Sequence, residues 1–73
     1  LLMHVVNSVG PEMDLPSARA ILTNLVQSGA LEEGVAHALY TAMGERSLAA
    51  VPRERRAAVR ADMMKQVLLL QLA

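Results

Sequence analysis

The fold is decided by the segment that runs from Asp14 to Gly44, DLPSARAILTNLVQSGALEEGVAHALYTAMG. Its first half repeats apolar residues at intervals of one, three and four, which places them on one side of an α-helix. These residues are Ala18, Ile21, Leu22, Leu25 and Val26. Their adjacent pairs exclude a β-strand, whose side chains alternate between two faces. We predict a helix that begins at Asp14, whose carboxylate can cap the first turn, and ends at Gly29, which can adopt a left-handed conformation.

The second half of this segment predicts another helix that folds back on the first. We expect it to start near Leu31, with Glu32 and Glu33 in the first turn, where negative charge faces the positive end of the helix dipole. Gly34 either weakens this helix or allows close approach of a neighbour, and the sequence leaves both open. The connection is short, so the two helices should be antiparallel. The predicted apolar face consists of Val35, Ala38, Leu39, Ala42 and Met43.

The flanking segments add two more helices. Residues 1–9 predict a short helix, and the breakers Gly10 and Pro11 end it. Its apolar face would hold Leu1, Leu2, Val5, Val6 and Val9. After a connector over residues 45–51, Pro52 suits the first turn of a long helix that continues to Leu72. The sequence therefore predicts an all-α fold: one domain over residues 1–73, a small bundle of about four helices with a short helix, an antiparallel hairpin and a longer C-terminal helix.

The last predicted helix carries apolar residues on two nearly opposite sides, at 100° per residue. One stripe is Val59, Met63, Val67 and Leu70, and the other is Ala57, Ala61, Met64, Leu68 and Leu72. A chain of 73 residues can hardly surround such a helix by itself. We therefore expect part of this surface to face a partner. The alternative is that the short N-terminal helix covers the second stripe.

The formal net charge is zero, but the charges are unevenly distributed. Acidic residues dominate the first 45 positions and basic residues the rest. Four arginines, Arg53, Arg55, Arg56 and Arg60, gather where the last helix begins, and positive charge there opposes the helix dipole. We expect these arginines to have partners, which are acidic groups of the same chain, an acidic protein surface or phosphates.

The composition and motifs argue against several classes of function. The chain is 53% hydrophobic with a single aromatic residue, Tyr40, and it has no Cys, which excludes a disulfide scaffold and a thiolate metal site. His4 and His37 lie on different predicted elements, and no glycine-rich phosphate loop occurs. No apolar run approaches the roughly 20 residues that cross a bilayer. We expect no catalysis, cofactor, metal ion, small-molecule ligand or membrane span. Because the chain does not begin with Met, we also expect it to be part of a longer protein.

One segment resembles a known DNA-binding element. Residues 15–33 resemble the recognition helix and following turn of winged-helix domains, through the pattern Leu25-x-x-x-Gly29-x-Leu31. The resemblance implies a DNA-binding domain with helix 15–28 as its recognition helix. Ser17, Arg19, Thr23 and Gln27 would then face the major groove. We rank this reading second and do not expect nucleic acid as the partner, because one positive charge neutralises few phosphates and a helix follows where the wing should be.

The function that we predict is non-catalytic protein–protein interaction, by a docking, assembly or adaptor domain or a small subunit of a larger complex. Its partner would be another protein chain or a second copy of itself. The apolar C-terminal helix would supply the contact, because an amphipathic helix can complete a partner's bundle or groove. The predicted anchors are Met63, Met64, Val67, Leu68 and Leu70, and the predicted charged rim is Arg53, Arg56 and Arg60.

Overall fold

The computed structural model describes residues 2–72, and the side chains of residues 3–71. Within these residues the chain forms four α-helices and one 3₁₀ turn, and no strand. The helices are α1 (Leu2–Ser8), α2 (Leu15–Gln27), α3 (Glu33–Ala42) and α4 (Arg56–Leu72), and the 3₁₀ turn is η1 (Arg53–Arg55). The predicted all-α fold is confirmed. Leu1 and the side chains of Leu2 and Leu72, which were assigned to apolar faces, lie outside the described residues.

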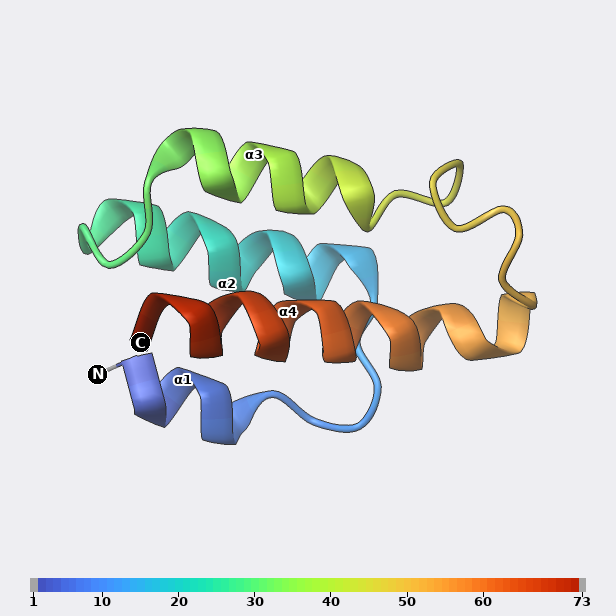
Figure 1. The fold of residues 1–73 in the computed structure, drawn as a ribbon, viewed down its shortest axis with the longest axis horizontal. Coiled ribbons are helices and arrows are strands. Elements are labelled where there is room, and N and C mark those ends of the chain that lie inside the picture. The colour runs from blue at the N-terminus through green and yellow to red at the C-terminus, as the bar shows by residue number, and fades with distance from the viewer. Residues whose placement is uncertain (1, 73) are drawn as a thin grey trace.

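In the view of Figure 1 the four helices follow one another from top to bottom in the order α3, α2, α4, α1. α2 packs against α3 and α4, and α4 also packs against α1. The bundle measures 33 × 23 × 21 Å, and its long axis follows the helices. The predicted antiparallel hairpin of α2 and α3 is present, and α1 lies along α4, which is the arrangement that the alternative sequence reading required.

The ends of α2 match their predicted signals. The Asp14 carboxylate accepts a hydrogen bond from the Ser17 backbone N–H at 2.9 Å, and this bond lowers the pKa of Asp14. Gly29 has φ +79°, a backbone conformation that residues other than glycine rarely adopt. The N–H groups of Ala30 and Leu31 then donate to the Leu25 carbonyl and close the helix. Local chemistry therefore fixes both ends of α2.

The start and buried face of α3 differ from the prediction. α3 begins at Glu33 instead of near Leu31, which is buried in the turn before the helix. Ala38 is exposed, and Ala36 is buried in its place. The reason is that α3 packs against α2, so its buried face is centred on Leu39, and Ala38 lies about 100° away from that centre.

Gly34 does not serve close packing in α3. A Cβ added to this residue would meet no atom within 4 Å. Of the two readings that the sequence left open, the weakened helix is therefore the one that the structure supports.

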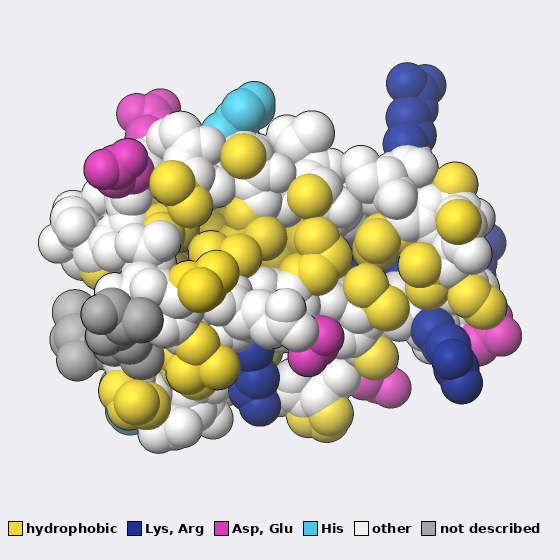
Figure 2. All heavy atoms as spheres, in the orientation of Figure 1, with side chains coloured by type: hydrophobic (Ala, Val, Ile, Leu, Met, Phe, Trp, Pro, Cys, Tyr) yellow, Lys and Arg dark blue, Asp and Glu magenta, His cyan; other side chains and the backbone are white. Residues whose placement is uncertain are grey.

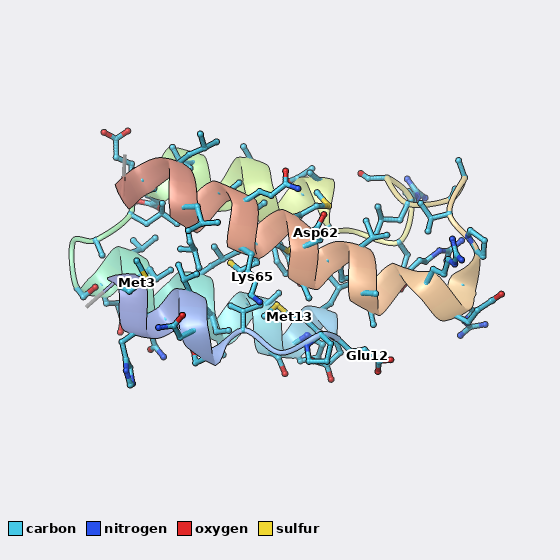
Figure 3. All side chains as sticks on the ribbon, turned by 60° about the horizontal axis from the view of Figure 1, so that its bottom comes forward. Met3, Glu12, Met13, Asp62 and Lys65 are labelled. Carbon is cyan, nitrogen blue, oxygen red and sulfur yellow. The ribbon has the colours of Figure 1, made fainter. Side chains whose placement is uncertain are left out.

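The core is built from aliphatic side chains of every helix. Its largest fully buried members are Met43, Met64 and Leu68. The loop between α1 and α2 joins it through Met13, whose side chain is buried and whose N–H donates to the Ala57 carbonyl at 3.0 Å. Figure 3 shows Met13 beneath α4, with Lys65 reaching from α4 toward the same loop. The loop and α1 together therefore cover one side of α4.

Candidate interaction surface

The two apolar stripes of α4 have different surroundings. The stripe with Ala61, Met64 and Leu68 is buried, with 3%, 0% and 0% of the residue exposed. On the other stripe, Met63 and Val67 are half-buried at the edge of the core, and Leu70 is 71% exposed. Only the second stripe is therefore available to another molecule.

This result corrects part of the predicted partner surface. Met64 and Leu68 were expected to be anchors for a partner, but the chain buries both in its own core. The physical reason is that α1 and α2 pack on that side of α4 and take its apolar side chains. Met63, Val67 and Leu70 lie at the surface or its edge, so their role as anchors stays a prediction.

An apolar surface extends along one face of the bundle. Figure 2 shows hydrophobic side chains that gather in a band between α3 and α4. We define the apolar band as a set of apolar residues on α3 and on the outer stripe of α4, none of which is fully buried. They are Val35, Ala38 and Ala42 from α3 and Val59, Met63, Val67 and Leu70 from α4. The band combines two alanines on α3 with the longer side chains of Met63 and Leu70 on α4.

Two arginines of α4 bind the connector instead of a partner. Arg60 is 5% exposed; its Nε donates to the Met43 carbonyl at 2.9 Å and its Nη2 pairs with Glu45. Arg56 pairs with the other oxygen of Glu45, with 2.5 Å between Nη1 and Oε2. Its Nε also donates to the carbonyls of Leu48 and Val51, at 3.1 and 3.2 Å. The two guanidinium groups therefore hold residues 43–51 onto the start of α4.

The electrostatics of this cluster follow from its geometry. Hydrogen bonds from Arg56, and then from Arg60, lower the pKa of the Glu45 carboxyl. Arg56 and Arg60 were predicted to be rim residues for a partner, but they are occupied inside the chain, and their acidic partner is Glu45 and not Glu32 or Glu33. Arg53 is exposed and forms no ion pair within residues 2–72, so its rim role stays a prediction.

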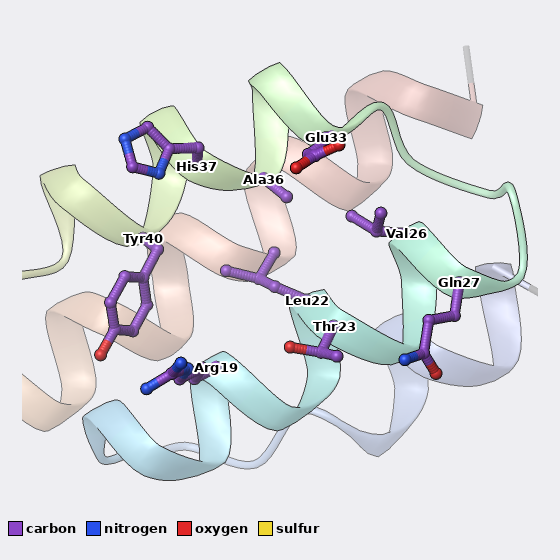
Figure 4. A pocket seen from close by; sticks show the side chains of 9 residues that line it. All are labelled: Arg19, Leu22, Thr23, Val26, Gln27, Glu33, Ala36, His37 and Tyr40. Carbon is purple, nitrogen blue, oxygen red and sulfur yellow. The ribbon is translucent and has the colours of Figure 1, made fainter.

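A groove lies between α2 and α3 (Figure 4). It is an open groove of about 470 Å³ with an apolar floor and polar walls that include Arg19, Glu33 and the half-buried Tyr40. All of its lining residues come from α2 and α3. The predicted DNA-facing residues Arg19, Thr23 and Gln27 line this groove, but Ser17 lines a separate hollow beside the α1–α2 loop. The structure therefore does not place all four residues on one surface.

Other surface features are isolated. Met3 and Leu69 are 51% and 48% exposed and lie outside the apolar band. Among the described residues, no group of three or more His, Asp or Glu side chains could hold a metal ion. Within the same residues, no helix combines the length and apolar character that crossing a bilayer requires.

The fold and the apolar band define a small helical domain with an apolar surface on one side. Comparison with protein families gives this class a name. The model of the CtsR C-terminal dimerization domain matches residues 1–69, and the chain belongs to this family. A comparison with curated protein sequences found no match. The predicted interaction module is therefore confirmed in its coarser form, as a domain for self-association.

Sequence reasoning missed the role of Glu45. Its spacing of 11 and 15 positions from Arg56 and Arg60 matches no helical contact, because a non-helical connector lies between them. The cluster of arginines at the start of α4 was the only signal. Local charge repulsion there indicated a need for acidic partners, but the sequence could not say which residue supplied them.

Proposed function

We propose that this domain dimerises through the apolar band of α3 and α4. The observation that carries the proposal is the exposure of Leu70, at 71%, next to Met63 and Val67 on the same stripe of α4. A small protein gains free energy when such a surface is removed from water. Family membership supports a second copy of the chain as the partner.

The proposed anchors differ in how they would act. Leu70 protrudes and would insert into the partner, whereas Met63 and Val67 form the edge of the core and would be covered. Methionine suits such a site because its flexible thioether adapts to a facing surface. The alanines of α3 let the partner approach closely. No step of this function requires chemistry by a side chain, which agrees with a non-catalytic role.

The test uses two neighbouring leucines of the same helix. Leu70→Asp places a charge in the apolar band, and we expect it to make the domain monomeric because the charge would be desolvated in the dimer. Leu69→Asp is the matched control, since Leu69 is also exposed but lies about 100° away around α4. Light scattering or sedimentation at micromolar concentration measures the mass of each variant, and circular dichroism checks that both variants are folded.

Two outcomes of this test would contradict the proposal. If Leu70→Asp remains dimeric while Leu69→Asp becomes monomeric, the contact uses the other flank of α4, and the proposal is wrong. Equal loss of dimer in both variants would also contradict it, because the band would then have no special role.

A further inference from the structure

The two ends of the bundle carry opposite charge. The turn between α2 and α3, with the start of α3, holds Glu32 and Glu33 and no cationic side chain. The other end contains the connector, η1 and the first turns of α4; over residues 43–60 it has five arginines and two glutamates, a net charge of +3. Figure 2 shows acidic side chains at the first end, and basic side chains together with acidic ones at the second. The domain is therefore polarised along its 33 Å axis.

Much of this charge is open to a partner. Arg56 and Arg60 are paired with Glu45, but Arg46, Arg53 and Arg55 are exposed and form no ion pair in the part of the chain that the structure describes. Glu32 and Glu33 are also exposed and form none within those residues. We call the residues 28–33 the acidic turn and the residues 46–55 the basic tip. Both therefore have charges that form no ion pair within residues 2–72.

We propose that two copies of the domain meet antiparallel across the apolar band, so that the acidic turn of each faces the basic tip of the other. This inference rests on the proposed function and adds the orientation of the partner. A symmetric dimer must place identical patches around a two-fold axis. If the axis ran along the helices, the two basic tips would meet and so would the two acidic turns. An axis perpendicular to the helices joins opposite charges at both ends.

Helix dipoles favour the same orientation. In the antiparallel dimer, α4 of one copy runs opposite to α4 of the other, so the positive end of each faces the negative end of its neighbour. The exposed ion pairs add little affinity individually and are screened by salt. The apolar band would therefore supply most of the affinity, and the charged ends would select the orientation.

Distances between spin labels test the orientation directly. The chain has no Cys, so a single introduced Cys carries the label. Ala50→Cys marks the basic tip and Gln27→Cys marks the end that holds the acidic turn; both positions are exposed, and neither change alters a charge. When both chains of the dimer carry Ala50→Cys, we expect a distance between the two labels comparable to the 33 Å length of one domain. When one chain carries Ala50→Cys and the other Gln27→Cys, we expect a short distance between the labels.

The outcomes separate the orientation from the function. The mass of each labelled sample is measured first; a monomer would contradict the proposed function itself. A dimer with short distances between identical labels, and long ones between the mixed labels, would show a parallel arrangement. That result would overturn the antiparallel inference and leave dimerisation intact.

Charge reversal gives an independent test. Glu32→Lys with Glu33→Lys should weaken the antiparallel dimer by roughly three- to thirtyfold at low salt, and less at high salt. Adding Arg53→Glu and Arg55→Glu to the same chain should restore the affinity, because opposite charges face each other again. An unchanged dissociation constant in the first variant, or no recovery in the second, would contradict the proposal.

Discussion

Leu68 and Leu70 are two positions apart on α4, and they have opposite environments. Leu68 has no exposed surface and lies among the side chains of the core, whereas Leu70 is 71% exposed. The adjacent Met63 and Met64 show the same contrast, since Met64 is fully buried and Met63 lies at the edge of the core. Residue type is identical within each pair. The difference therefore comes from the neighbours that α4 has on each side, and it separates what holds the domain together from what remains for a partner.

The largest expected effect concerns the inner side of α4. Leu68→Ala should reduce the free energy of unfolding by about 2–5 kcal/mol, because it removes buried methyl groups and leaves a cavity. Leu70→Ala should change it by no more than about 0.5 kcal/mol, since that side chain is mostly in water. Urea denaturation measures both at a protein concentration low enough for the domain to be monomeric, so that dissociation does not contribute. Similar losses of unfolding free energy at the two positions would contradict the difference between the two sides of α4.

A smaller effect is expected where α4 holds the connector. Arg60→Met keeps the length of the side chain but leaves the buried Met43 carbonyl without its donor, which should destabilise the fold by about 1–3 kcal/mol. The exposed Arg53 is the matched position, and Arg53→Met should change the free energy of unfolding by less than about 0.5 kcal/mol. Thermal unfolding of the two variants checks the difference. A neutral Arg60→Met would mean that the connector is held by Arg56 alone.

The smallest expected effect is on the pH dependence of stability, through Glu45, the partner of Arg56 and Arg60. Because the folded domain lowers the pKa of Glu45, the stability that this group contributes is present above the ordinary glutamate pKa and is lost as the pH falls through the lower folded value. Asp14, whose pKa is also lowered, acts in the same direction. Glu45→Gln should therefore make unfolding less dependent on pH in the acid range. Denaturation midpoints between neutral and acid pH measure this slope, and an unchanged slope would contradict the assigned role of Glu45.

Local signals allowed much of the fold to be predicted. Asp14 and Gly29 act through their own backbone neighbourhood, so the ends of α2 could be read directly from the sequence. The burial of Ala36 in place of Ala38 could not, because the face that α3 buries depends on where α2 lies. The same holds for α4: two apolar stripes were evident, but the positions of α1 and α2 decided which one the chain covers. Of the predicted anchors, Met63, Val67 and Leu70 lie at the surface or its edge, whereas Met64 and Leu68 belong to the core.

The position of Tyr40 has a consequence for spectroscopy. It is the only aromatic residue of the chain, and it lies half-buried in the groove between α2 and α3, which has no lining residue from α4. All near-ultraviolet absorbance and fluorescence of the domain therefore originate in the helical hairpin. The emission of Tyr40 should report the opening of α2 from α3, because its side chain lies in the groove between them. A single natural chromophore thus gives a signal for the unfolding of the hairpin.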